Sequence, residues 1–379
     1  MIRVVCDAAV VQIEKALSPW SDQIELIQLP SGEINSGALT GAQALITRSV
    51  TQVKESLLKD ANELKFVGTA TIGVDHVDQA YLQSRQIKFA SAAGCSKHAV
   101  AQYVIAVTHL LRPQLINPDL GKKPVLGIVG YGHIGSTLAR YAQALGFDLL
   151  ICDPYVSSPH VQVELSQLLA QSEVISLHVP LTGQNDPSCN HPTHHLIGEP
   201  ELALIKPGAL LINSARGAVI SQSALQSALE SSEFDAALDV FEFEPVISSH
   251  LLDQLALATP HIAGYSAQGK LNATRLVSAE LGRHFGLGGE TQAPLDRFWL
   301  PSDLSGFLAT WYDPRLDEAA LKGCLTTFPD KQTTQIYRQR QDLAPSKVTE
   351  PACFEALRKN YSLRTDWGFV DLAGSEPAA

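Results

Sequence analysis

The sequence predicts an α/β protein in which helices cover parallel β-sheets. Two observations favour this class: short, almost wholly apolar runs alternate with helical patterns up to about residue 285, and a glycine-rich turn joins one such run to the helix after it. Strands of parallel sheets read as continuous apolar runs because helices bury both of their faces. At 379 residues the chain is too long for one hydrophobic core, so two or three domains are expected.

The composition is that of a globular protein, with 45% hydrophobic and 18% charged residues and a formal charge of −11. Nucleic acids and anionic membranes would be repelled by this charge, so neither is expected as a partner. No run reaches the roughly 18 apolar residues of a membrane helix, and the N-terminus lacks the pattern of a signal peptide. The six cysteines form no C-x-x-C pair. Neither structural zinc nor a disulfide framework is therefore expected, and a cytoplasmic location is favoured.

The first α/β series has four expected strands, each ending in polar or glycine-containing residues: 2–7, 44–49, 65–71 and 87–92. Loops at the ends of such strands commonly carry function. Residues 97–112 then place apolar side chains at helical spacing over about four turns.

The second series has six expected strands: 124–130, 148–153, 174–180, 209–215, 236–240 and 255–263. Helical stretches separate most of them, for example 134–145 and 223–231. Six parallel strands in one block are what a doubly wound dinucleotide-binding fold requires. After a helical pattern at 271–285, a glycine- and proline-rich break at 286–294 predicts a domain boundary.

A glycine-rich turn joins the strand 124–130 to the helix after it and has the pattern G-x-G-x-x-G, made by Gly130, Tyr131, Gly132, His133, Ile134 and Gly135. Such a turn lets the backbone approach a pyrophosphate, which the helix amides then bind. Asp153 ends the next strand, where a carboxylate accepts hydrogen bonds from the ribose and repels a 2′-phosphate. The turn therefore predicts a Rossmann-type domain that binds NAD rather than NADP, although a similar turn also occurs in other α/β proteins.

Arg216 follows the expected strand 209–215, at the strand end where open α/β sheets bind ligands. Its planar guanidinium matches a carboxylate in a bidentate way that lysine cannot copy. An arginine that only caps or pairs with a helix would fit the same position equally well.

Two further strand ends carry groups suited to proton transfer. Asp239, Glu242 and Glu244 lie at the end of one strand, and His261 follows the next. A dehydrogenase needs a base that titrates near neutrality for the alcohol proton, and a carboxylate on the other imidazole nitrogen fixes the tautomer. On spacing alone, Glu242 and Glu244 both remain candidates for that carboxylate.

Several motifs together resemble the D-isomer-specific 2-hydroxyacid dehydrogenases over roughly residues 1–285: the glycine-rich turn, HVPL (178–181), THHLI (193–197), IKPGALLINSARG (205–217), ALDVFEFEP (237–245) and TPHIAGYS (259–266). The resemblance implies that Arg216 binds the substrate carboxylate and that Glu244, in the E-P pair, is the partner of His261. It implies cofactor contacts for Val179, Ser214, Ala215, Asp239 and Gly264. Val179 departs from the family, where threonine is common.

A narrower resemblance involves TRSVT (47–51), FVGTATIGVDHVD (66–78), AAGCS (92–96), YDPRLDEAALK (312–322) and FEALRKNYSLR (354–364). These segments are similar to family members that oxidise 4-phospho-D-erythronate in vitamin B6 biosynthesis. The resemblance implies substrate contacts for Ser49, Thr71 and Tyr265. Arg48 is a further candidate, because an acidic chain needs a local cation to bind an anion.

The same resemblance implies a flavodoxin-like substrate domain (1–94 with 262–285), a Rossmann-type NAD domain (95–261) and a small α+β C-terminal domain (286–379) that forms a homodimer. Two alternatives stay open: a dehydrogenase for 3-phosphoglycerate or another D-2-hydroxy acid, and an NAD(H)-sensing scaffold without activity. The scaffold is disfavoured because Arg216, Glu244 and His261 are all present. The loop 182–195 contains Cys189, His191, His194 and His195, but their spacing matches no zinc pattern, so no metal is expected.

Overall fold

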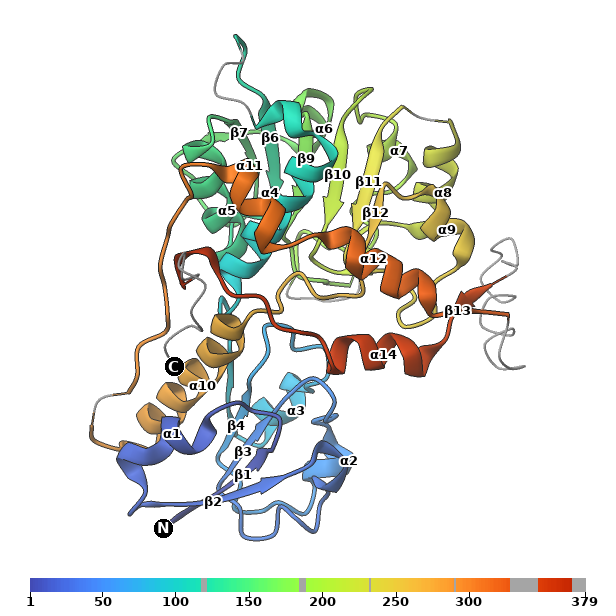
Figure 1. Ribbon diagram of the computed structural model, residues 1–379. Coiled ribbons are helices and arrows are strands. Elements are labelled where there is room, and N and C mark those ends of the chain that lie inside the picture. Colours follow the sequence, from blue (N-terminus) through green and yellow to red (C-terminus); the bar gives the residue numbers. More distant parts are fainter. Residues whose placement is uncertain (117–120, 184–188, 232, 290, 328–346, 370–379) are drawn as a thin grey trace. The chain divides into compact units, whose positions relative to one another are not determined.

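The computed structural model divides the chain into two compact units. The first unit contains residues 1–97 and 265–297, and the second contains 98–264 and 298–368. The structure describes residues 1–116, 121–183, 189–231, 233–289, 291–327 and 347–369 (Figure 1).

The first unit is built on a five-stranded parallel sheet in the order β2-β1-β3-β4-β5. Its strands are β1 (Ile2–Asp7), β2 (Ile24–Leu29), β3 (Ala44–Thr47), β4 (Phe66–Thr69) and β5 (Lys88–Ser91), and its helices are α1 (Ile13–Leu17), α2 (Glu55–Leu58), α3 (Gln79–Ser84) and α10 (Ala267–Phe285). This strand order is flavodoxin-like, as predicted. β2 was not predicted, because it lies at the sheet edge, where Glu25 and Gln28 are exposed and interrupt its apolar run.

Hydrophobic clusters cover both faces of this sheet. Alternate residues of β1 enter different clusters: Val4 packs with Phe66 and Val277, whereas Val5 packs with Leu45 and Val67. Successive side chains of a strand point to opposite faces, so every residue of a central strand can be buried. α10 covers one face although it lies far along the chain from the strands.

The second unit contains a seven-stranded sheet in the order β12-β11-β10-β9-β6-β7-β8, with every neighbouring pair parallel. Its strands are β6 (Val125–Val129), β7 (Asp148–Cys152), β8 (Val161–Gln162), β9 (Val174–Leu177), β10 (Leu210–Asn213), β11 (Asp235–Leu238) and β12 (Leu257–Ala258). The predicted Rossmann-type, doubly wound arrangement is therefore confirmed. β8 was missed because both of its residues are exposed at the edge.

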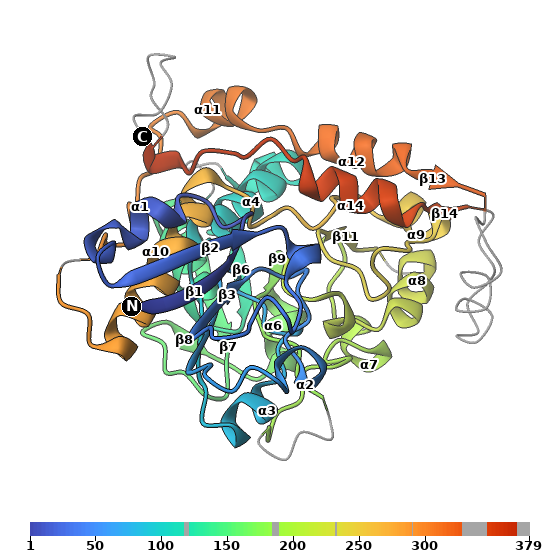
Figure 2. The same cartoon turned by 90° about the horizontal axis from the view of Figure 1, so that it is seen from below.

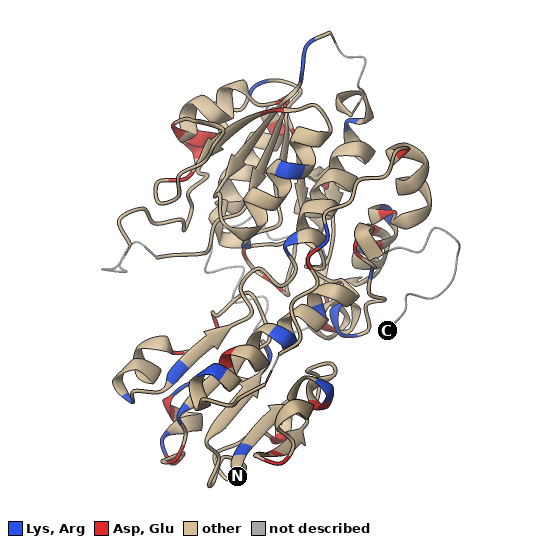
Figure 3. Ribbon diagram, turned by 90° about the vertical axis from the view of Figure 1, so that its left-hand side faces the viewer, with Lys and Arg blue, Asp and Glu red and all other residues tan. Residues whose placement is uncertain are grey.

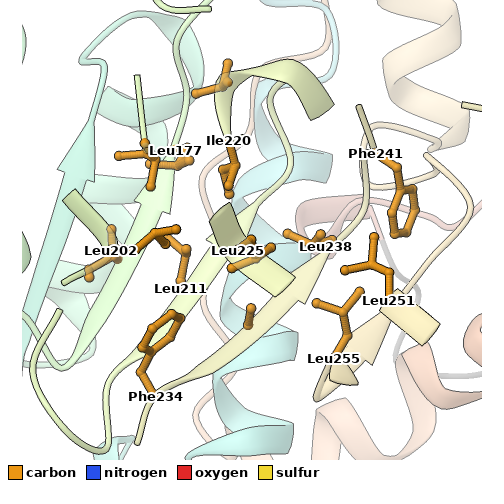
Figure 4. Close-up of a cluster of buried hydrophobic side chains, with 14 of the residues drawn as sticks. Leu177, Leu202, Leu211, Ile220, Leu225, Phe234, Leu238, Phe241, Leu251 and Leu255 are labelled. Atoms are coloured by element: carbon orange, nitrogen blue, oxygen red, sulfur yellow. The ribbon is translucent and has the colours of Figure 1, made fainter. Parts of the chain in front are cut away.

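The helices of the second unit's α/β part are α4 (Lys97–Leu111), α5 (His133–Ala144), α6 (Leu165–Gln171), α7 (Glu199–Leu202), α8 (Gln222–Ser231) and α9 (Ser249–Gln254). Figure 4 shows part of the core that they enclose, where Leu211 and Leu238 of the sheet lie near Leu225 of α8. None of the described helices is long and apolar enough to cross a membrane. Basic and acidic positions are interleaved along the ribbon (Figure 3).

Residues 298–368, here called the C-terminal segment, belong to the second unit. The segment contains α11 (Leu304–Trp311), α12 (Pro314–Gly323), β13 (Leu325–Thr326), β14 (Val348–Thr349) and α14 (Pro351–Lys359), and the short helix η5 (Trp367–Phe369) follows at its end. The segment packs with the rest of the second unit and does not form a third compact unit of its own. The three-domain division expected from the sequence stays a prediction.

One disulfide corrects the interpretation of the cysteines. Cys324 and Cys353 are bonded, with their Cα atoms 5.6 Å apart. Their sequence separation of 29 residues matches no recognisable spacing. Figures 1 and 2 show why they meet: α12 and α14 run side by side, and Cys324 follows one helix while Cys353 lies in the other.

Candidate active site

The glycine-rich turn joins β6 to α5. Gly130 has a φ of +93°, and a Cβ there would lie 2.7 Å from the carbonyl oxygen of His178, so glycine is required. A Cβ at Gly132 would meet nothing within 4 Å, which leaves space beside the turn. Among the described residues no side chain caps the start of α5. Its first amides can therefore bind a phosphate, as a dinucleotide requires.

Asp153, directly after β7, holds this turn in place. One carboxylate oxygen accepts a hydrogen bond from the Tyr131 amide at 2.7 Å, and the other accepts from the amides of Tyr155 and Val156 at 2.8 and 3.0 Å. The side chain stays partly exposed. A negative charge beside the turn suits a ribose hydroxyl and disfavours a 2′-phosphate, so the residues present fit NAD.

Ser214 and Ala215 lie just beyond β10. The hydroxyl oxygen of Ser214 is buried and makes no hydrogen bond within the described part of the chain. A buried polar group without a partner costs free energy, so this hydroxyl suits a bound group at the same edge of the sheet. The Ala215 amide donates to Asn213 Oδ1 at 3.0 Å, and Val179 lies half-buried after β9.

His261 and Glu244 form a hydrogen-bonded pair. His261 Nδ1 lies 2.8 Å from Glu244 Oε2, and Glu244 Oε1 accepts from the Phe241 amide at 2.8 Å. The His261 side chain is 31% exposed, and its Nε2 makes no hydrogen bond to the residues that the structure describes. Nε2 is therefore the atom that can take a proton from a ligand.

Burial alone would raise the pKa of the Glu244 carboxyl. The positive charge of His261, the hydrogen bonds from His261 and Phe241, and the charge of Arg358 together hold this pKa below its usual value. Glu244 is therefore ionised at neutral pH. A carboxylate at Nδ1 keeps the proton on that nitrogen and leaves Nε2 as the acceptor.

Glu242, the competing carboxylate, faces a different histidine. Its Oε1 lies 2.9 Å from His195 Nε2, and its Oε2 accepts from the Gln222 amide at 2.9 Å. Two glutamates in one short motif thus have different partners, which spacing alone could not decide.

Arg216 follows β10 and is half-buried. Its Nη1 donates to the Ala215 carbonyl at 2.7 Å, and its own carbonyl accepts from Asn213 Nδ2 at 2.9 Å. The next residue, Gly217, packs so closely that a Cβ would overlap the Phe241 carbonyl group. The Arg216 loop therefore lies directly against the strand end that carries Glu244.

Asp239 is buried and holds the loop that contains His261. Its Oδ1 accepts from Thr259 Oγ1 at 2.6 Å and from the Ile262 amide at 2.8 Å, while Oδ2 accepts from the Ala263 amide at 2.9 Å. Burial raises the pKa of this carboxyl above its ordinary value, and the charge of His261 and these hydrogen bonds offset that rise only in part. Sequence reasoning missed this supporting role. The predicted contact with the nicotinamide stays a prediction, as does that of half-buried Gly264.

The substrate residues predicted in the first unit follow its strands or precede α10. Arg48 and Ser49 come after β3, Thr71 after β4, and Tyr265 shortly before α10. Carboxyl ends of parallel strands share one sheet edge, which is where ligands bind in such sheets. Ser49 is exposed, and the Thr71 hydroxyl donates to the Gly73 carbonyl at 2.8 Å.

Lys270 joins this group and was missed in the sequence. Its ammonium lies 5.5 Å from the centre of the Tyr265 ring, and burial together with the charge of Arg48 lowers its pKa. Neither Arg48 nor Lys270 pairs with a carboxylate of the described residues. A lysine in the first turn of α10 also opposes the helix dipole. This unfavourable position is the sequence feature from which Lys270 could have been predicted as a site residue.

The histidine-rich loop is only partly described. His194, His195 and Glu242 place three potential metal-ligand atoms within 4.8 Å of one another. Cys189 lies apart from them, with its thiol donating to Thr182 Oγ1 at 3.3 Å, and the His191 amide donates to the Tyr155 hydroxyl. The expectation of no metal in this loop stays a prediction.

Comparison with known proteins identifies the family. Residues 111–263 match the NAD-binding domain of the D-isomer specific 2-hydroxyacid dehydrogenases. The erythronate-4-phosphate dehydrogenase of Psychrobacter cryohalolentis is 38% identical over 97% of each chain. The chain belongs to the erythronate-4-phosphate dehydrogenase family. An Acinetobacter baumannii member is 40% identical over 86% of this chain and 87% of its own.

A solved structure extends the comparison. The D-lactate dehydrogenase of Aquifex aeolicus, complexed with NAD and lactic acid, is 27% identical, with a TM-score of 0.56 over 75% of this chain and 96% of its own. Membership in the erythronate-4-phosphate dehydrogenase family makes the chain an NAD-dependent oxidoreductase. The predicted family, enzyme class and cofactor are confirmed.

Proposed function

We propose that this family member oxidises the C2 hydroxyl of 4-phospho-D-erythronate to (R)-3-hydroxy-2-oxo-4-phosphobutanoate in vitamin B6 biosynthesis. The observation that carries the proposal is the His261–Glu244 pair, 2.8 Å apart, with Nε2 of His261 left to face a ligand. His261 takes the hydroxyl proton at Nε2, and Glu244 stabilises the imidazolium that forms. NAD, when bound, supplies the acceptor for the C2 hydride.

Arg216 binds the substrate carboxylate in this proposal. Gly217, the residue after Arg216, packs directly against the Phe241 backbone. Because Phe241 and Glu244 belong to one motif, this contact places Arg216 close to that motif. A bidentate guanidinium holds both carboxylate oxygens and so fixes the orientation of C2.

In the first unit, Arg48 and Lys270 bind the phosphate, and Ser49, Thr71 and Tyr265 make further substrate contacts. Two neighbouring cations without a carboxylate partner among the described residues favour an anion, because each repels the other when no ligand is present. A phosphate carries the charge to compensate both.

NAD binding is assigned to the turn 130–135, with Asp153 at the ribose and Val179, Ser214, Ala215, Asp239 and Gly264 along the cofactor. The uncapped start of α5 and the unpartnered Ser214 hydroxyl support this assignment within the described residues.

Steady-state kinetics with three substrates test the proposed substrate. We expect kcat/KM for 4-phospho-D-erythronate to exceed that for D-erythronate and for 3-phosphoglycerate by at least about tenfold. Lys270→Met should lower kcat/KM roughly 10- to 150-fold with the phosphorylated substrate and less than about threefold with D-erythronate, since hydrogen bonds to charged groups contribute about 1.5–3 kcal/mol.

The exposed Lys59 provides the matched control, and Lys59→Met should leave all three values unchanged. A wild-type preference for 3-phosphoglycerate would make the proposed substrate wrong. Equal losses on erythronate with and without phosphate would show that Lys270 does not bind the phosphate.

We further propose that the protein is a cytoplasmic homodimer formed through residues 286–379. In this proposal the chain has three functional domains: a substrate domain (1–94 with 262–285), an NAD domain (95–261) and a dimerisation domain (286–379). Leu316 of α12, 72% exposed in the single chain, supports a partner surface there. Light scattering should give twice the chain mass of 40.8 kDa, and a mass of one chain would refute the dimer. Cell fractionation tests the location, and recovery with membranes would contradict it.

A further inference from the structure

A buried arginine of the C-terminal segment touches the backbone directly after the catalytic histidine. Arg364 is 7% exposed, and its Nη2 donates to the carbonyls of Ile262 at 2.9 Å and Ala263 at 2.7 Å. Its Nη1 donates to the Tyr361 hydroxyl at 2.7 Å. The guanidinium thus binds two consecutive peptide groups, and Ile262 is the residue that follows His261.

Aromatic rings enclose this guanidinium. Its central carbon lies 4.4 Å from the ring centre of Tyr312, 5.6 Å from that of Tyr361 and 5.9 Å from that of Tyr103. The hydroxyls of Tyr312 and Tyr361 both donate to Asp317 Oδ2, at 2.6 and 3.1 Å. A buried cation needs such compensation, and ring faces together with an ordered hydroxyl network provide it.

Asp239 holds the same two residues through their amides, since it accepts hydrogen bonds from the N–H groups of Ile262 and Ala263. The amides and the carbonyls of both residues therefore have side-chain partners, Asp239 for the amides and Arg364 for the carbonyls. His261 itself has a φ of +58°, in the left-handed region that side chains rarely adopt. A conformation of this kind persists only where its surroundings determine it.

The C-terminal segment also binds the strand end that carries Glu244. The buried Thr349 hydroxyl donates to the Pro245 carbonyl at 2.7 Å and accepts from the Ile247 amide at 2.8 Å, and the Thr349 amide donates to the Ile247 carbonyl at 2.9 Å. One segment therefore contacts the backbone next to both members of the His261–Glu244 pair.

We propose that Arg364 is a positioning residue for the oxidation, because it fixes the peptide groups after His261 and thereby aims the imidazole. The C-terminal segment is then part of the catalytic apparatus, in addition to any role in assembly. The inference rests on the proposed function only in that His261 is the base. It does not depend on which D-2-hydroxy acid is the substrate.

Arg364→Lys tests the proposal, since lysine keeps the charge and the contact with the rings but cannot bind Tyr361 and two carbonyls in one fork. We expect the variant to fold, with the dissociation constant for NAD and KM each within about threefold of wild type. kcat should fall about 10- to 100-fold, as expected for a small misplacement of a catalytic group. The acid limb of the kcat/KM profile should also move, because the aim of the imidazole toward Glu244 changes.

Two companion variants sharpen the comparison. Arg315→Gln removes an exposed arginine of the same segment, which pairs only with Asp313 among the described residues, and should leave kcat unchanged. Tyr361→Phe removes the hydroxyl that orients Arg364 but leaves the arginine in place. Tyr361→Phe should lower kcat by about three- to tenfold at constant KM. If Arg364→Lys does not fold, this variant alone tests whether Arg364 positions His261.

The outcomes separate a positioning role from a structural one. A lower melting temperature with wild-type kcat and an unmoved pH profile in Arg364→Lys and Tyr361→Phe would overturn the proposal. If wild type fails to oxidise 4-phospho-D-erythronate but the variants lose turnover with another D-2-hydroxy acid, the proposed substrate is wrong and the role of Arg364 stands.

Discussion

Replacing His261 with glutamine should lower kcat by about 10²- to 10⁴-fold, the range that a general base contributes. Glutamine keeps a side chain able to hydrogen-bond Glu244, which lies 2.8 Å from His261 Nδ1, so the loop should hold its shape. It has no nitrogen that accepts a proton near neutral pH. The dissociation constant for NAD should stay within about threefold, because the hydrogen bonds that hold the glycine-rich turn, as far as the structure describes the chain, do not involve His261. Stopped-flow measurement of NADH formation at saturating substrate gives the turnover directly.

The chain contains a closely matched control for this experiment. His195 also has a left-handed backbone, with φ of +54° against +58° for His261. One of its ring nitrogens likewise lies close to a carboxylate, although the atom differs: Nε2 of His195 is 2.9 Å from Glu242, whereas Nδ1 of His261 is 2.8 Å from Glu244. His195→Gln should change kcat by less than about threefold. If both variants lost turnover equally, disturbance of the loops rather than loss of a base would explain the result. Near-wild-type turnover of His261→Gln at saturating NAD would remove His261 from the mechanism.

How far the sequence predicted this fold depends on where each strand lies in its sheet. Central strands such as β3 and β10 are buried at every position, so their apolar runs stand out. The edge strands β2 and β8 face solvent on at least one side and lack that signal. Local pattern therefore predicted the layers and the winding of both units but missed an edge of each.

The candidate site divides in the same way between local and long-range information. Gly130 and Asp153 could be predicted because a phosphate-binding turn needs those residue types at a fixed place after a strand. The choice between Glu242 and Glu244 needed the three-dimensional path of the chain, since both follow one strand. Arg364 lies about a hundred residues along the chain from the carbonyls that it binds, and the residues next to it in the sequence form no pattern that predicts this contact.

Replacing Arg216 with lysine should lower kcat/KM roughly 10- to 150-fold, which corresponds to the 1.5–3 kcal/mol of a hydrogen bond to a charged group. Lysine retains the positive charge but offers a point donor, so one of the two carboxylate contacts and the orientation that they enforce are lost. The loss should be shared between KM and kcat, because a loosely held carboxylate both weakens binding and turns C2 away from His261.

The exposed Arg283, which pairs with Glu280 on the surface of α10, provides the control, and Arg283→Lys should leave kcat/KM unchanged. The decisive comparison combines the two active-site changes. If Arg216 acts by orienting C2 toward His261, the double variant Arg216→Lys, His261→Gln should lose less than the product of the single losses, since a misaligned base has little left to lose. Strictly multiplicative losses would mean that Arg216 contributes binding alone. Wild-type kcat/KM in Arg216→Lys would instead show that Arg216 does not hold the substrate carboxylate, and its bond from Nη1 to the Ala215 carbonyl would then serve the structure of the loop.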